Sequence, residues 1–188
     1  VEHADLSKIA TYHCNDMVVD TQGRAYVGNF GSDIESGNKL VKANLAFVDT
    51  DGSVSVAAED LAFPNGAVIT PNGKTLIIGE TFGRCLTAFD IADDGGLSNR
   101  RIWANLHPHI PDGICLDAEG AIWLADPANN CVVRVAEGGD VLQKIEMGNG
   151  TFACMLGGED RKTLFVCTAA GSGSKAEERL TAKIEACE

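Results

Sequence analysis

A repeat with a period in the forties constrains the fold of this chain more than any single motif does. Four segments share a polar residue or turn, an apolar run, a glycine-containing turn and a second apolar run. They begin at Asn15, Asn65, Asp112 and Ala153, which are 50, 47 and 41 residues apart. This period is typical of a four-stranded β-propeller blade.

Strand-like apolar runs also lie between these hairpins, at 46–49, 86–89 and 132–135. They supply the additional strands that a blade needs. We therefore predict an all-β chain that forms one propeller domain over residues 1–188, with about four blades starting near 15, 65, 112 and 152. The last blade is predicted to hold only three strands, at 152–156, 163–167 and 181–187. Residues 174–180 are predicted to be a loop or a single turn.

Charge and hydropathy exclude several classes of partner. The chain has 27 acidic and 15 basic residues, a formal net charge of −12. This acidity disfavours nucleic acids and anionic membrane surfaces. The apolar runs are one strand long, well short of the roughly 20 residues of a spanning helix. The chain starts at Val1 with no signal-peptide pattern, so we expect that processing or truncation removed the true start.

The seven cysteines are odd in number and have no Cys-x-x-Cys spacing. This pattern favours free, buried thiols in a reducing cytoplasm over a disulfide scaffold.

Equivalent positions of the repeat carry oxygen-bearing side chains. The first strand of every propeller blade runs beside the central channel, so Asn15, Asn65 and Asp112 should converge there. Amide carbonyls and a carboxylate are ligands for a hard divalent cation. The alternative is that Asn65-Gly66 and Asp112-Gly113 are ordinary turns, because asparagine, aspartate and glycine all tolerate left-handed conformations.

Several ordered motifs resemble those of the gluconolactonase and senescence-marker-protein (regucalcin) family. They are Asn15-Asp-Met-Val-Val-Asp20, Phe63-Pro-Asn-Gly66, Pro111-Asp-Gly-Ile-Cys-Leu-Asp117 and Phe152-Ala-Cys-Met-Leu-Gly-Gly158. The resemblance covers essentially the whole chain. It implies a six-bladed propeller that hydrolyses sugar lactones and related esters with one divalent ion in its channel.

The resemblance also implies roles for single residues. Asn65 and Asp112 match metal ligands, Asn15 matches a residue beside the ion or the substrate, and Asp112 is expected to assist the attacking water. Calcium is the expected ion, with zinc, manganese and magnesium as alternatives. His13 stands where relatives often carry a substrate-binding arginine, and we expect it to face the channel near the substrate, two residues before Asn15 on the same strand face.

One family motif is missing. The family has a metal-ligating glutamate in an early Glu-Gly-Pro motif that does not occur here. The resemblance implies that the family begins about two blades earlier and that this chain starts in the last strand of the second blade. Asp112 would then be the one carboxylate ligand. Both ends of the arc should expose apolar inter-blade faces, through which we expect self-association.

The predicted function is metal-dependent hydrolysis of a small-molecule sugar lactone. The ion would polarise the carbonyl while Asp112 orients or deprotonates a water molecule. The alternative is a non-catalytic propeller fragment that binds a small molecule or a protein. Specificity is expected to depend on channel-mouth loops such as 30–42.

Other groups of residues give weaker indications of function. His107, His109 and Cys115 are zinc-type ligands, but structural zinc normally takes four. Cys14 is predicted to be a buried thiol rather than a nucleophile activated by His13, because adjacent strand residues face opposite ways. The two tryptophans, Trp103 and Trp123, are predicted to pack between blades.

Overall fold

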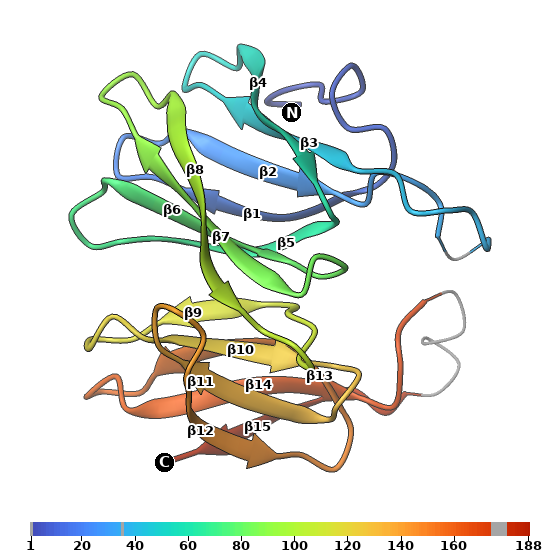
Figure 1. The fold of residues 1–188 in the computed structure, drawn as a ribbon, viewed down its shortest axis with the longest axis vertical. Helices are drawn as coiled ribbons and strands as arrows, with labels where there is room; N and C mark the ends of the chain where they lie inside the picture. Colours follow the sequence, from blue (N-terminus) through green and yellow to red (C-terminus); the bar gives the residue numbers. More distant parts are fainter. Residues whose placement is uncertain (1, 35, 174–179) are drawn as a thin grey trace.

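The computed structural model describes residues 2–34, 36–173 and 180–188, and these form four antiparallel sheets (Figure 1). Blade 1 contains β1 (Cys14–Val19), β2 (Ala25–Asn29), β3 (Ala43–Val48) and β4 (Val54–Leu61). Blade 2 contains β5 (Pro64–Ile69), β6 (Thr75–Glu80), β7 (Cys85–Ile91) and β8 (Leu97–Asn105). Blade 3 contains β9 (Ile114–Leu116), β10 (Ile122–Asp126), β11 (Cys131–Val135) and β12 (Val141–Glu146). Blade 4 contains β13 (Gly150–Gly157), β14 (Thr163–Ala169) and β15 (Lys183–Cys187).

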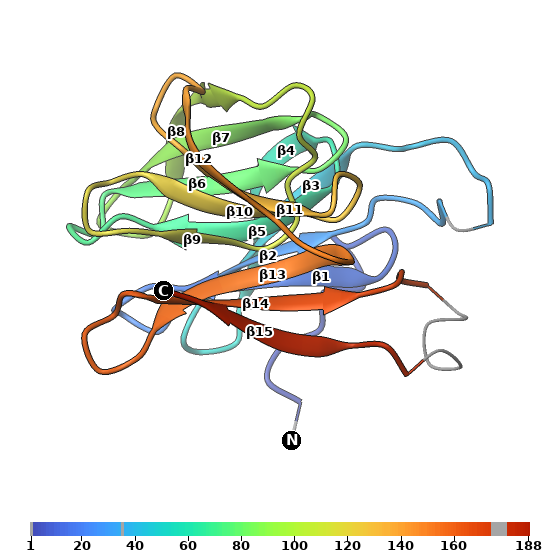
Figure 2. The ribbon, with the colours of Figure 1, turned by 90° about the horizontal axis from the view of Figure 1, so that it is seen from below.

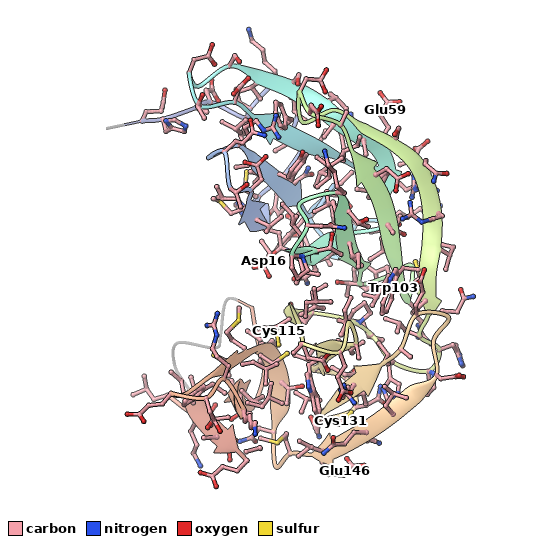
Figure 3. All side chains as sticks on the ribbon, turned by 90° about the vertical axis from the view of Figure 1, so that its left-hand side faces the viewer. Asp16, Glu59, Trp103, Cys115, Cys131 and Glu146 are labelled. Carbon is pink, nitrogen blue, oxygen red and sulfur yellow. The ribbon has the colours of Figure 1, made fainter. Side chains whose placement is uncertain are left out.

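The blades follow one another around an arc that is open on one side (Figure 3). In each blade the strands pair in chain order, and the innermost strands β1, β5, β9 and β13 contact one another in succession. Asp16 lies on the concave side of the arc, whereas Glu59 and Glu146 lie at its outer rim (Figure 3). The predicted all-β fold of four propeller blades is confirmed, and the last blade has three strands among the described residues.

The core is divided into layers between neighbouring blades. One layer joins residues of β2–β4 to β6 and β7, a second joins blades 2 and 3, and a third joins blades 3 and 4. The middle strands of blades 1 to 3 are largely buried on both faces, which explains their uninterrupted apolar runs, such as Leu76-Ile77-Ile78. Trp103 packs in the second layer and Trp123 in the third, so their predicted inter-blade packing is confirmed.

The amino-terminal segment differs from the prediction. The described residues before Cys14 form turns and coil, so the expected strand of a preceding blade is wrong. Instead, Ala4, Leu6 and Ile9 pack against the face of β2 and β3 that does not meet blade 2. This segment therefore covers part of the apolar face that the sequence had led us to expect in water. At the other end Met155, Phe165 and Ile184 stay exposed.

All seven cysteines are free thiols, as expected, but they are not all buried. Cys14 and Cys167 are exposed, so the prediction of a buried Cys14 is wrong. The described residues include no helix of the length and apolarity that a membrane span requires. The segment predicted as a loop or single turn, 174–180, lies outside the described residues except for Leu180.

Candidate functional site

The inner ends of the blades enclose a hollow of about 570 Å³. Asn15, Asn65 and Asp112 all line it, although they belong to three different blades. Parts of the loop after β2 and of the segment after β14 border the same hollow; both extend from one side of the arc (Figure 2). The structure thus brings together the three residues that the repeat had singled out.

A β-bulge recurs at the start of the inner strands. The strand register shifts between Cys14 and Met17 in β1, between Pro64 and Ala67 in β5, and in β13 at Phe152. A bulge bends its strand and re-aims a side chain, and bulges are common next to active sites. The extra residues of β1 and β5 include Asn15 and Asn65, so the bulges present these amides to the hollow.

The turn interpretation of the two Asn/Asp-Gly pairs is wrong. Neither Gly66 nor Gly113 has a positive φ. Each is required because neighbouring inner strands approach closely: a Cβ on Gly66 would lie 2.6 Å from the Asp112 carbonyl oxygen. The amide of Gly66 donates to the Asp112 carbonyl at 3.2 Å, and that of Gly113 donates to Phe152 at 3.0 Å. In the structure, therefore, the residue of blade 4 that is equivalent to Asp112 is Phe152, one residue before the predicted Ala153.

A hydrogen-bonded threonine fixes the orientation of the Asn65 amide. The Thr81 hydroxyl donates to the Pro111 carbonyl at 2.9 Å and accepts from Asn65 Nδ2 at 3.1 Å. A hydroxyl has one proton, and Thr81 uses it on Pro111, so it can only accept from Asn65. Nδ2 must then face Thr81, which leaves Asn65 Oδ1 directed elsewhere. Similarly, Asn15 Nδ2 donates to the Pro64 carbonyl at 3.2 Å, which leaves its Oδ1 available.

Asp112 carries a perturbed carboxyl group. Burial is the main cause and raises its pKa to about 7; hydrogen bonds from Asn65 and Gly113 oppose this rise, and the charge of Asp16 adds to it. Protein around the Asp16 carboxyl also raises the pKa of that group, although much of the residue is open to solvent. Among the described residues, no cationic side chain opposes either rise. The concave side thus holds two acidic groups whose ionisation is unfavourable without a counter-charge.

The sequence reasoning missed Asp16. Strict strand alternation places Asp16 on the face opposite Asn15, but the bulge between Cys14 and Met17 breaks that alternation. The same bulge undermines the argument that His13 shares a face with Asn15. His13 is exposed, does not line the hollow, and packs on Tyr12 and Phe30 with ring centroids 4.2 Å and 6.2 Å away. Phe30 does line the hollow, so the substrate-binding role of His13 stays a prediction.

The zinc trio of His107, His109 and Cys115, which the sequence disfavours, does not assemble among the described residues. Among the described residues, the one group of three metal-type ligands comprises His109, Asp126 and Cys131, all buried, with ligand atoms within 4.8 Å of one another. His109 Nδ1 lies 2.7 Å from Asp126 Oδ2, which also accepts from Asn129. Two ligands of tetrahedral zinc are about 3.3 Å apart, given metal–ligand distances near 2 Å. The pair is therefore hydrogen-bonded, next to the loop that carries Asp112.

Comparison with known proteins agrees with this architecture. Pentonolactonase XacC of Haloferax volcanii is 29% identical over 163 residues, which cover 85% of this chain and 54% of that protein. The structure of a gluconolactonase from Xanthomonas campestris superposes with a TM-score of 0.68 at 25% identity, covering 82% of this chain and 54% of that one. The calcium-binding protein regucalcin from Agrobacterium tumefaciens superposes with a TM-score of 0.73 at 21% identity, covering 91% and 60%.

This chain thus spans between half and two thirds of the length of the proteins it matches. The sequence profile of the SMP-30/gluconolactonase/LRE-like region matches residues 2–170. Because that match takes in nearly all of the four blades and every residue of the hollow up to Phe152, the chain belongs to the SMP-30/gluconolactonase/LRE-like family.

Proposed function

We propose that this chain forms a large part of the active site of a lactone hydrolase that depends on a divalent cation. The observation that carries the proposal is the Asp112 carboxyl, held beside Asn65 and Asn15 in the hollow with a pKa raised to about 7. The relatives named as a pentonolactonase and a gluconolactonase supply the reaction class. Among lactones, the sequence predicts the sugar lactones.

The residues of the hollow fit a hard cation. Asn65, Asp112 and Asn15 offer amide and carboxylate oxygens, and the hydrogen bonds of both asparagines leave Oδ1 free to coordinate. Oxygen donors favour calcium, magnesium or manganese over softer metals, and calcium tolerates irregular geometry. A cation would also balance the acidic charge of Asp16 and Asp112. We therefore propose calcium, with magnesium, manganese and zinc as alternatives.

A cation bound there would polarise the lactone carbonyl and make water more acidic. The chain's own residues would supply positioning and proton transfer. Asp112 would orient the attacking water and accept its proton as the water oxygen bonds to the carbonyl carbon. The ring C–O bond would then break, and the departing alkoxide would take that proton back from Asp112 to give a hydroxy acid. Asn15 would bind the substrate. His13 would lie at the margin of the site, because it packs on Phe30, which lines the hollow.

The small-molecule lactone is the first partner that we propose, and a second copy of the chain is another. Met155, Phe165 and Ile184 lie on blade 4 with 60%, 39% and 73% of their surfaces exposed. An apolar face of this kind favours association in water. We propose that the 188-residue chain self-associates through blade 4, which sedimentation velocity tests.

Hydrolysis of a lactone panel in calcium tests the proposed function. We expect activity that EDTA removes, and a loss of about a thousandfold or more in kcat/KM for Asp112→Ala, because both a ligand and the proton acceptor are lost. Asp140→Ala, an acidic-to-alanine change in the turn between β11 and β12, should retain activity. Full activity of Asp112→Ala, or activity that is indifferent to EDTA, would contradict the proposal.

A further inference from the structure

The wall of the hollow is aromatic. Four of the chain's seven phenylalanines line it: Phe30, Phe63, Phe82 and Phe152. They come from four separate places, namely the ends of β2 and β6, the residue before β5, and β13. Ile34 and Pro127 extend the apolar lining. The oxygen groups of Asn15, Asn65, Thr81 and Asp112 lie in the same hollow.

Three of the phenylalanines are in direct contact. The ring centroids of Phe30 and Phe63 are 4.5 Å apart and tilted by 32°, and those of Phe63 and Phe82 are 5.2 Å apart at 83°. The three rings therefore do not share one plane. This differs from a single flat platform on which a sugar ring could stack.

One residue of the wall, Phe63, has a strained backbone conformation. Phe63 is buried with φ of 63°, a left-handed conformation that a bulky residue rarely adopts. The carbonyl of Phe63 accepts a hydrogen bond from the backbone amide of Thr81 at 3.1 Å. Thr81 is the residue whose hydroxyl orients Asn65. Strained residues of this kind concentrate at functional sites. Phe82, by contrast, is 48% exposed, a large apolar surface that faces the hollow rather than a core.

The polar complement of the hollow is small. Among the described residues that line it, Asp112 is the one with an ionisable side chain. A sugar lactone carries a hydroxyl on almost every ring carbon, and each hydroxyl that leaves water needs a hydrogen-bond partner. On the part of the site that the described residues build, the polar side chains are those of Asn15, Asn65, Thr81 and Asp112, where the proposed cation and the carbonyl would lie, and that of Ser172. The rings of Phe30, Phe63 and Phe82 offer no hydrogen-bond partner to hydroxyls along the wall.

We infer that the substrate is a lactone bearing an apolar substituent, with its carbonyl at Asn65 and Asp112 and its substituent against Phe30, Phe63 and Phe82. This inference rests on the proposed lactone hydrolase function, and it replaces the sugar lactones that the sequence predicts with a more apolar class of lactone. Apolar area removed from water provides the binding energy. Phe82 acts as a specificity-determining residue, because its exposed ring can be covered by the substituent.

Three δ-lactones of equal ring size separate the classes: gluconolactone, unsubstituted δ-valerolactone and δ-decalactone, which carries an alkyl chain. With calcium present we expect kcat/KM for δ-decalactone to exceed that for gluconolactone by about tenfold or more. Phe82→Ala should lower kcat/KM for δ-decalactone about tenfold, and that for δ-valerolactone by less than about threefold. Phe82→Leu should recover most of the loss. Ile102→Ala, which trims an exposed apolar side chain of β8 outside the hollow, should change neither value.

Direct binding, followed by NMR titration of the same three lactones, distinguishes the possible failures. Preferential hydrolysis and binding of gluconolactone, or an unchanged δ-decalactone preference in Phe82→Ala, would overturn the inference and leave the hydrolase proposal standing. Binding of δ-decalactone that Phe82→Ala weakens, without hydrolysis of any lactone, would support the inference and count against catalysis. A chain that neither binds nor hydrolyses any of the three would overturn both.

Discussion

The inner strands of blades 3 and 4 begin with the same backbone arrangement but carry different side chains. Asp112 and Phe152 each accept a hydrogen bond from the glycine amide of the preceding blade, at 3.2 Å and 3.0 Å. One of them is an acid whose pKa is raised to about 7, and the other is an apolar ring in the wall of the hollow. The fold therefore accepts an apolar residue at this position. The polar side chains of Asn65 and Asp112 are explained by chemistry at the hollow rather than by the needs of the backbone.

The largest effect is expected from a substitution that disrupts the close approach of neighbouring inner strands. Gly66→Ala would place a Cβ 2.5 Å from the Ile114 nitrogen and 2.6 Å from the Asp112 oxygen, where backbone atoms cannot move aside. We expect a loss of about 3 kcal/mol or more in the free energy of unfolding, measured by urea denaturation. Gly148→Ala, which meets no atom within 4 Å and has no positive φ, is the matched control. A Gly66→Ala chain as stable as that control would show that blades 2 and 3 do not approach as described.

A smaller effect concerns the acidic side chain of this pair, Asp112, and the pH dependence of the free energy of unfolding. The pKa of Asp112 is about 7 in the fold, above its ordinary value near 4, so the folded chain binds this proton more tightly than the unfolded chain. Its contribution to stability is complete below pH 4 and is lost as pH rises through 7. In EDTA, Asp112→Asn should therefore be more stable than the original chain by roughly 2 to 4 kcal/mol at pH 8 and equal to it at pH 4.

Urea denaturation at the two pH values measures that difference, and Asp140→Asn is the control for loss of one charge. Calcium should reverse the order at pH 8 by stabilising only the chain that retains Asp112. A stability difference that does not change with pH would contradict the described environment of this carboxyl.

The smallest effect concerns the Asn65 amide. Thr81→Val keeps the shape of the side chain but removes the hydroxyl, so Asn65 loses one acceptor of Nδ2 and is less firmly oriented. We expect calcium affinity to fall about tenfold, equivalent to about 1.4 kcal/mol. Thr81→Ser retains the hydroxyl and should bind calcium as the original chain does. Equal calcium affinities for the valine and serine variants, measured by calorimetry, would show that the Thr81 hydroxyl has no role in the cation site.

The sequence predicted the blades and three residues of the site because both follow from a repeat in register. Strand alternation and glycine-containing turns predict hairpins locally, and propeller symmetry brings Asn15, Asn65 and Asp112 together in the hollow at the inner ends of the blades. Asp16 escaped notice because a β-bulge leaves no clear mark in the sequence. The packing of Ala4, Leu6 and Ile9 on blade 1 could not be foreseen either, because an irregular segment has no periodicity.

The aromatic wall shows the same limit. Phe30, Phe63, Phe82 and Phe152 have no common spacing and do not occupy one position of the repeat. Only the arc brings the ends of different strands together around the hollow. The chemistry of a propeller site is therefore partly predictable from repeat positions, whereas its specificity depends on loops and strand ends that follow no repeat.

Calcium titration by calorimetry at pH 8 tests the central claim most directly: that oxygen side chains at the start of β5 and before β9 form one cation site. We expect the original chain to bind calcium, Asn65→Ala to bind it about tenfold or more weakly, and Asn105→Ala, on the outer strand β8, to bind it as the original chain does. A chain that binds no calcium, or an Asn65→Ala variant that binds it as tightly as the original, would contradict the account.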